Sequence, residues 1–485
     1  MPEGGAKRTK THAVAKSVIA NRVSLIANHS SSPIHYLCED FKPGLIKRTP
    51  PPIHLATIPA LLPAERFELS NGLKVLAMGG VDQPVIRAEL IWDAGRPFET
   101  GELVGDLVND LLLEDTHQHA AAEVEAYFEQ YGTTLDQPDV MDTCNLGVNT
   151  THRFMDEVLP MMAEVAATPA FNEESFDRCL RQRRQRLREN LADNDSLAFR
   201  LITEASYGSY HPYGYNSYPE SYKQLQLDRV KAYYDSHFHA GNATLFVVGK
   251  LDDKVYQLLE NSFGSLRSGP RAEANPLPPA PAKGRLLQVI RPRAEQTMIR
   301  SGRVGIDIRD PDYAALVVLD TIYGGYFGSR LMRNIREEKG LTYGIESEVD
   351  TYRFNGDFGV SADVANESLG IVRAEIAKEG ERLRQDLVGD KELEMVRAYL
   401  SGSVSIQLDG IFGHAYRHRS AVIKNYDAHA HLQRLSQTIL EITPQQIREV
   451  AQRFLAPEAH WEVILGGGEL QAGAELIQHP KARLM

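Results

Sequence analysis

The same order of predicted elements occurs twice in this chain, once on each side of a proline-rich segment. Two strands, two helices, two further strands and then more helices are predicted within residues 63–265 and again within residues 285–470. Proline, alanine and glycine dominate residues 266–284, a composition typical of a linker. The repetition indicates a duplication. Each half is expected to be an α+β domain, with a mostly antiparallel sheet covered by helices on one face.

Glycine positions mark the clearest turns in the two halves. In the first half, the pair Asn71-Gly72 lies between two strand-like runs and is the strongest short signal for a β-hairpin. In the second half, a glycine-rich turn over 324–328 precedes a helix that Ser329 can cap and that Gly340 ends. A strand is then expected to open at Tyr343.

Composition excludes several classes of function. The chain has 485 residues, a formal net charge of −12 and three cysteines. The acidic balance argues against nucleic acid as a partner, and no apolar run approaches the roughly 18 residues that a membrane span needs. Cys38, Cys144 and Cys179 show no Cys-x-x-Cys spacing, so neither a disulfide framework nor a zinc knuckle is predicted. A reducing compartment fits, and we expect the cytoplasm.

Both ends of the chain are expected to lie outside the two halves. Residues 1–62 form an N-terminal extension whose first part is basic and almost free of acids. A flexible or partner-clasping arm explains this composition, and an organelle-targeting segment is the alternative. Residues 41–63 are rich in proline and predict an extended strap. Residues 471–485 are expected to be a tail.

Arg336 and Tyr343 are the first candidate functional pair. Arg336 falls in the last turn of a predicted helix and Tyr343 at the entry of the next strand, so both side chains could reach one cleft. An arginine and a tyrosine hydroxyl together suit the binding of a peptide carbonyl and of the oxyanion that it becomes. A surface arginine and a half-buried sheet tyrosine are the other interpretation, and the residues alone leave both open.

The sequence around this pair resembles a known family. The string GGYFGSRLMRNIREEKGLTYGI is similar to the C-terminal half of the M16 peptidases, which include insulinase, pitrilysin and the mitochondrial processing peptidase. The resemblance extends over roughly residues 63–470. It implies that Arg336 and Tyr343 are the family's arginine–tyrosine pair, and that two halves close like a clamp over a peptide.

The metal motif of that family is altered in this chain. Active members carry His-x-x-Glu-His on the first long helix of the N-terminal half, where the two histidines hold zinc and the glutamate activates water. The matching segment here is GELVGDLVNDLLLEDT, and its five motif positions read Asp106, Leu107, Val108, Asn109 and Asp110. Both histidines are therefore aspartates, and the glutamate is an asparagine that cannot act as a base.

The third metal ligand is also missing. The resemblance puts it near Gln185–Arg186, and the nearest acid, Glu189, lies about one helical turn away. Arginines fill this segment instead: Arg178, Arg181, Arg183, Arg184, Arg186 and Arg188. They either pair with Asp106 and Asp110 or form a solvated helix face, which is the usual interpretation of a charge run. A calcium or magnesium ion on the two aspartates is a further possibility, less economical than solvated or capping acids.

Other groups give weaker signals. His414 and His418 are spaced i, i+4, and the pairs His117/His119 and His237/His239 are close in sequence, but no acid follows at the spacing of a base. Each is expected to be a surface or hydrogen-bonded core histidine. The chain has no Gly-x-Ser-x-Gly motif, and its cysteines lack a nucleophile signature.

We therefore expect a non-catalytic subunit of a heterodimeric M16-type zinc metallopeptidase. The partner would be a zinc-bearing M16 homologue that supplies the metal and the catalytic groups, with no cofactor on this chain. This chain would contribute Arg336, Tyr343 and a chamber wall for a peptide or unfolded polypeptide. Two alternatives remain: a structural scaffold that resembles the core proteins of a respiratory complex, and a metallopeptidase with a non-standard metal site.

Overall fold

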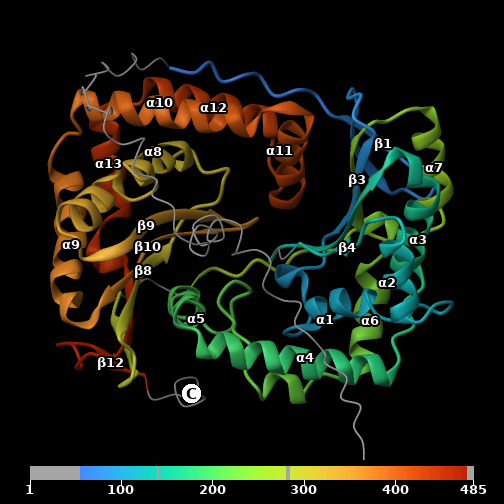
Figure 1. Ribbon diagram of the computed structural model, residues 1–485, viewed down its shortest axis with the longest axis horizontal. Coiled ribbons are helices and arrows are strands. Elements are labelled where there is room, and N and C mark those ends of the chain that lie inside the picture. Colours follow the sequence, from blue (N-terminus) through green and yellow to red (C-terminus); the bar gives the residue numbers. More distant parts are fainter. Residues whose placement is uncertain (1–54, 139–140, 280–283, 478–485) are drawn as a thin grey trace, which may run out of the picture. The chain divides into compact units, whose positions relative to one another are not determined.

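The computed structural model describes residues 55–138, 141–279 and 284–477 (Figure 1). Most of the predicted N-terminal extension, part of the linker and the end of the predicted tail lie outside these ranges. Within the described residues, no helix is both long and apolar enough to cross a membrane. Residues 55–62 contain no helix or strand, and residues 475–476, in the predicted tail, pair with the second sheet.

The first half contains a six-stranded sheet. Its strands are β1 (Glu65–Glu68), β2 (Lys74–Met78), β3 (Val85–Trp92), β4 (Leu135–Asp136), β5 (Cys144–Thr151) and β6 (Ala243–Gly249). They are arranged in the order β1-β2-β6-β3-β5-β4, and only the pair β2–β6 is parallel. The hairpin β1–β2 turns at the predicted Asn71-Gly72, where Gly72 adopts a φ of 85° that favours glycine.

The second half repeats this sheet. Its strands are β7 (Leu286–Ile290), β8 (Gln296–Val304), β9 (Thr342–Thr351), β10 (Gly356–Ala365), β11 (Trp461–Gly466) and β12 (Glu475–Leu476). Their order is β12-β7-β11-β8-β10-β9, with β7 parallel to β11 as β2 is to β6. Five neighbouring strands of one sheet therefore match five of the other in order and direction. The predicted α+β duplication is confirmed.

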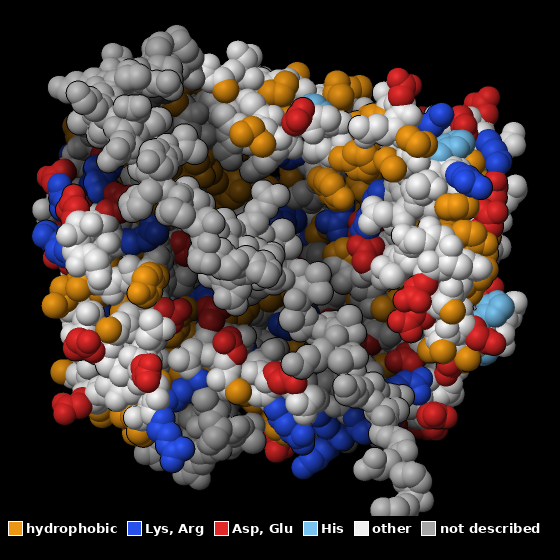
Figure 2. Space-filling view, in the orientation of Figure 1, with side chains coloured by type: hydrophobic (Ala, Val, Ile, Leu, Met, Phe, Trp, Pro, Cys, Tyr) orange, Lys and Arg blue, Asp and Glu red, His pale blue; other side chains and the backbone are white. Residues whose placement is uncertain are grey.

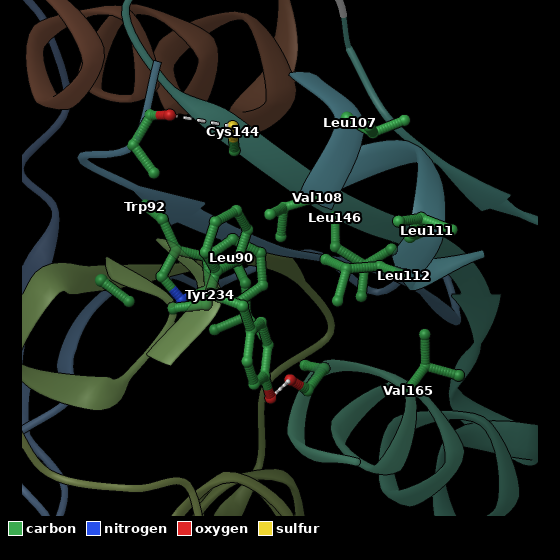
Figure 3. Close-up of a cluster of buried hydrophobic side chains, with 14 of the residues drawn as sticks. Leu90, Trp92, Leu107, Val108, Leu111, Leu112, Cys144, Leu146, Val165 and Tyr234 are labelled. Carbon is green, nitrogen blue, oxygen red and sulfur yellow. Dashed lines mark hydrogen bonds between the residues drawn. The ribbon is translucent and has the colours of Figure 1, made fainter. Parts of the chain in front are cut away.

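The first half also contains helices, most of which lie on one face of its sheet. They are α1 (Val104–Leu112), α2 (Ala121–Glu129), α3 (Met155–Ala167), α4 (Glu173–Ala192), α5 (Asn194–Tyr207), α6 (Leu227–His237) and α7 (Asp253–Phe263). In α1, the apolar residues recur at helical spacing and are buried in the core with Leu90 and Leu146 of the sheet (Figure 3). Burying that stripe leaves the polar residues of α1 on its other side, and this orientation positions the candidate metal face.

The helices of the second half are α8 (Tyr313–Tyr323), a π-helix (Met332–Glu338), α9 (Leu369–Gln385), α10 (Asp390–Gln407), α11 (Gly410–Lys424), α12 (Ala428–Glu441) and α13 (Pro444–Phe454). The sequence patterns did not predict three of the helices, α5, α11 and α12. Two of them cross between the halves. Helix α5 packs on β8 and β11 of the second sheet, and α11 packs on β6 of the first (Figure 1).

Each sheet thus receives one helix from the other half on its second face. Ala415 and Ile423 of α11 lie in one buried cluster with Leu76 and Phe246 of the first sheet. Polar contacts accompany this exchange. The carboxylate of Glu89, on β3, is fully buried and accepts hydrogen bonds from Arg419 of α11 at 2.6 and 2.7 Å. The helices on one face were predicted, and the exchanged helices on the other face are an addition.

Candidate functional site

The altered metal motif lies on the exposed side of α1. Asp106 and Asp110 are one helical turn apart, and with Asn109 they line a cavity of about 600 Å³. The backbone carbonyl of Asn109 accepts a hydrogen bond from the side chain of Gln137. The side-chain Oδ1 of Asn109 is buried and has no hydrogen-bond partner among the described residues. The helix therefore presents two carboxylates and an amide where the family resemblance implies two histidines and a glutamate.

Arg183 of α4 occupies the space between the two carboxylates. Its Nε donates to Asp110 Oδ2 at 2.5 Å, and its Nη2 donates to the backbone carbonyl of Asp106 at 2.7 Å. Its Nη1 lies 3.8 Å from Asp106 Oδ2. Burial alone would lower the pKa of Arg183, but the charges of Asp106 and Asp110 outweigh burial and raise this pKa. The guanidinium is thus a fixed cation beside Asp106 and Asp110, and it occupies the carboxylates that a metal ion would need.

These residues do not fit a zinc ion. Zinc sites in proteins are built from His, Cys and carboxylate ligands, usually three or four of them around an accessible metal. Here two carboxylates already share an arginine, and zinc could enter only by displacing a half-buried guanidinium. Within the ranges that the structure describes, no cluster of three or more His, Cys, Asp and Glu residues is placed to hold a metal ion.

The other arginines of α4 divide into paired and solvated members. Arg178 donates to Glu114 from its Nε at 3.0 Å, and Arg184 donates to the backbone carbonyl of Tyr222 at 3.5 Å. Arg181, Arg186 and Arg188 are exposed, and Figure 2 shows a group of basic side chains over the region of α4. Both interpretations of the run therefore apply: its inner arginines pair, and its outer arginines are solvated.

Glu99 is a titratable group of this site that the sequence did not reveal. It lies just before α1 and accepts hydrogen bonds from the backbone N–H of Gly105 at 2.8 Å and from the hydroxyl of Tyr215 at 2.5 Å. Burial, and then the negative charge of Asp106, raise the pKa of Glu99 to about 7. No motif marks this residue, because its environment depends on a tyrosine more than a hundred positions away.

Tyr343 lines a second cavity, in the other half, whereas Arg336 is not among its lining residues and contacts one of them, Phe327. Tyr343 is the second residue of β9, 92% of its surface is exposed, and it lines a cavity of about 620 Å³ together with Phe327. Arg336 belongs to the π-helix, and its guanidinium carbon lies 4.8 Å from the centre of the Phe327 ring. π-Helical turns are rare and are frequent at functional sites. The hydroxyl of Tyr343 is therefore accessible to a ligand.

Local turn chemistry fixes the path of the chain around the π-helix and the start of β9. The hydroxyl of Ser329 accepts a hydrogen bond from the backbone N–H of Met332 at 3.4 Å, as expected of a helix cap. Gly340 ends the helix with a φ of 64°. At Gly324, a Cβ atom would lie 2.5 Å from the backbone nitrogen of Ser347, so only glycine allows the turn to lie this close to β9.

His414 and His418 contact the N-terminal strap. Nδ1 of His414 accepts a hydrogen bond from the backbone N–H of Leu62 at 3.2 Å, and Nε2 of His418 lies 2.8 Å from the carbonyl oxygen of Leu62. Burial lowers the pKa of both histidines, which favours the neutral form that the contact with His414 requires. Their i, i+4 spacing thus serves to hold a backbone segment.

The fold and the two cavities define a duplicated α+β chain in which an ion pair occupies the face of α1 where the resemblance implies a metal. Comparison with known proteins agrees with this class. Residues 224–400 match the family profile described as the peptidase M16 inactive domain. The matched segment belongs to the peptidase M16 family, and the resemblance stated above is confirmed.

Relatives and solved structures extend the likeness over most of the chain. This chain is 21% identical to an uncharacterized zinc protease of Bacillus subtilis (strain 168) over 352 residues. The aligned region covers 71% of this chain and 84% of that protein. The peptidase M16 inactive domain from Pseudomonas fluorescens has the same fold, with a TM-score of 0.75 and 24% identity over 84% of this chain and 98% of that one. A chain of complex III2 from Candida albicans gives a TM-score of 0.65 at 16% identity, over 83% of this chain and 96% of that one.

Proposed function

We propose that this chain is a non-catalytic, peptide-holding subunit that works as a heterodimer with a zinc-bearing M16 homologue. The observation that carries the proposal is the position of Arg183 between Asp106 and Asp110. An arginine that is already paired with both carboxylates leaves no face for zinc and no base to activate water. The similarity to zinc proteases, together with the closed metal face, supports a subunit that depends on a partner for the metal.

The second part of the proposal concerns Arg336 and Tyr343. A tyrosine hydroxyl that is exposed at a cavity can donate a hydrogen bond to a scissile carbonyl as it becomes an oxyanion. Arg336 would hold the substrate backbone or its carboxylate end from the neighbouring turn. The substrate would be a peptide or an unfolded polypeptide, and the zinc and the general base would lie on the partner. We also propose the cytoplasm as the compartment, since Cys144 and Cys179 are free thiols.

Reconstitution tests the proposal directly. The chain is recovered from native cells with its partner, and the partner's sequence is searched for His-x-x-Glu-His. Peptide cleavage is then measured for this chain alone, for the partner alone and for the mixture. We expect chelator-sensitive cleavage only when both chains are present. Robust cleavage by a homogeneous preparation of this chain would indicate a non-standard metal site. A mixture no faster than the partner alone would indicate a scaffold.

A further inference from the structure

The cavity beside α1 contains arginines that its own carboxylates do not neutralise. Its charged lining residues are Arg96, Arg183, Arg186, Arg200, Asp106, Asp110 and Glu114. Arg183 is shared between the two aspartates, and Glu114 pairs with Arg178. All three lining carboxylates are therefore already engaged. Among the described residues, Arg186 and Arg200 form no ion pair with any carboxylate.

Arg200 is the more unusual of the two. It belongs to α5, and its Nη2 donates to the backbone carbonyl of Ser217, which is a neutral acceptor. Its Nε is buried and has no hydrogen-bond partner among the described residues. Burial lowers the pKa of Arg200 to about 10. The negative charge of Glu204 and the ring of Tyr218 compensate this burial only in part, because burial still outweighs them, and an anion that enters the cavity would add the missing charge.

Arg186, on α4, also lines the cavity, and its side chain is exposed. The lining also includes apolar and amide side chains, among them Leu103, Leu187 and Asn190. A space of about 600 Å³ is in the range of sites that bind organic ligands of several groups, and its mostly polar lining suits a polar ligand such as a peptide. Amide side chains can pair with peptide N–H and carbonyl groups. A lone inorganic anion would use only a small part of this lining.

We propose that this cavity binds a carboxylate of a peptide between Arg186 and Arg200, on the helix face where the M16 resemblance puts a metal. The inference rests on the proposed peptide-holding function and names its substrate class, an acidic peptide segment. Arginine matches a carboxylate through two parallel N–H donors, which gives orientation as well as charge attraction. The site would then hold an acidic part of the substrate in one half while Tyr343 and Arg336 meet the peptide in the other.

Direct binding to this chain alone tests the inference without a partner. The probes are fluorescein-labelled peptides with amidated ends that differ only in two central residues, Glu-Glu or Gln-Gln, and a third Gln-Gln peptide with a free C-terminal carboxylate. Fluorescence anisotropy should show the Glu-Glu peptide binding at least about tenfold tighter than its Gln-Gln partner at low salt. Preference for the free carboxylate would identify the C-terminus as the anion held. Equal binding of all three peptides would overturn the inference.

Matched variants locate the site. Arg186→Ala should abolish most of the preference for the charged peptide, and Arg181→Ala should leave it unchanged, because both arginines are exposed on α4 and only Arg186 lines the cavity. Arg200→Met should act as Arg186→Ala does, with folding checked by circular dichroism. If neither cavity variant changes the preference while Arg181→Ala does, the anion binds the solvated outer face of α4 and the inference fails.

Inorganic phosphate separates a peptide site from a simple anion site. We expect phosphate to compete with the Glu-Glu peptide only weakly, since it cannot use the apolar and amide lining. Phosphate that binds the cavity tightly while the acidic peptide does not would overturn the inference in favour of a free phosphate site. The proposed function is tested separately by turnover of the two-chain complex, so peptide binding here and cleavage there can succeed or fail independently.

Discussion

Replacing Arg183 is the sharpest test of the closed metal face. Its side chain is 16% exposed, and those of Asp110 and Asp106 are 25% and 37% exposed. Exposed ion pairs contribute roughly 0–1 kcal/mol, whereas removing one partner of a fully buried pair costs about 3–5 kcal/mol. Because the exposure is intermediate and the contact with Asp110 is short, Arg183→Met should lower the free energy of unfolding by about 2 kcal/mol. A double-mutant cycle with Asp110→Asn should give a coupling energy of about 1 kcal/mol.

Tryptophan fluorescence provides the assay. The chain has two tryptophans, Trp92 in the first half and Trp461 in the second, so a Trp461→Phe background reports unfolding around Trp92, which is 1% exposed. Urea denaturation gives the free energies for the four members of the cycle. Arg181→Met, on the exposed side of the same helix, should change stability by less than about 0.5 kcal/mol. A coupling energy near zero would mean that Arg183 is solvated and that the metal face is open.

Three further results are expected. Glu89→Gln should lower the free energy of unfolding by about 3–5 kcal/mol at neutral pH, because the buried Arg87 and the half-buried Arg419 lose the fully buried carboxylate that they share. Burial alone would raise the pKa of Glu89, but the hydrogen bonds and charge of Arg419 hold it below its ordinary value. The ionised Glu89 carboxylate therefore stabilises the fold fully at pH values above its unfolded-state pKa, and this stabilisation is lost as pH falls through its folded-state pKa. The free energies of unfolding of wild type and variant should therefore converge at acid pH. Tyr343→Phe should reduce turnover of the two-chain complex roughly 100- to 1000-fold and leave its melting temperature unchanged. The exposed control Tyr210→Phe should change neither turnover nor melting temperature. The purified chain should contain no stoichiometric zinc after dialysis, and one tightly held equivalent by elemental analysis would contradict the proposed role.

Much of the fold was accessible from the sequence because the strands carry strong local signals. Val85–Trp92 and Ala243–Gly249 are apolar runs bounded by turns, and each is a strand in the structure. The stripe of apolar residues in α1 likewise fixed which side of that helix would carry Asp106 and Asp110. These signals depend on neighbours along the chain, and the duplication followed from them.

The exchanged helices were missed because their partners are distant. Helix α11 has the sequence GIFGHAYRHRSAVIK, whose histidines, arginines and glycines weaken any apolar stripe. His418 and Arg419 are satisfied there by Leu62 and by Glu89, more than three hundred positions away. The same holds for the site. The sequence showed a run of arginines, but only the approach of α4 to α1 selects Arg183 as the one that bridges the aspartates.

The exchange of α5 and α11 has a consequence for synthesis on the ribosome. Helix α5 packs against β11, which follows it by roughly 250 residues, and at roughly 5–20 residues per second that strand emerges more than about ten seconds later. During this time the part of α5 that packs on β11 has no partner, and the second face of the first sheet lacks α11 in the same way. Nascent chains of this protein should therefore depend on chaperones, and two fragments made by cutting between the halves should be insoluble apart and recover structure when they are produced together.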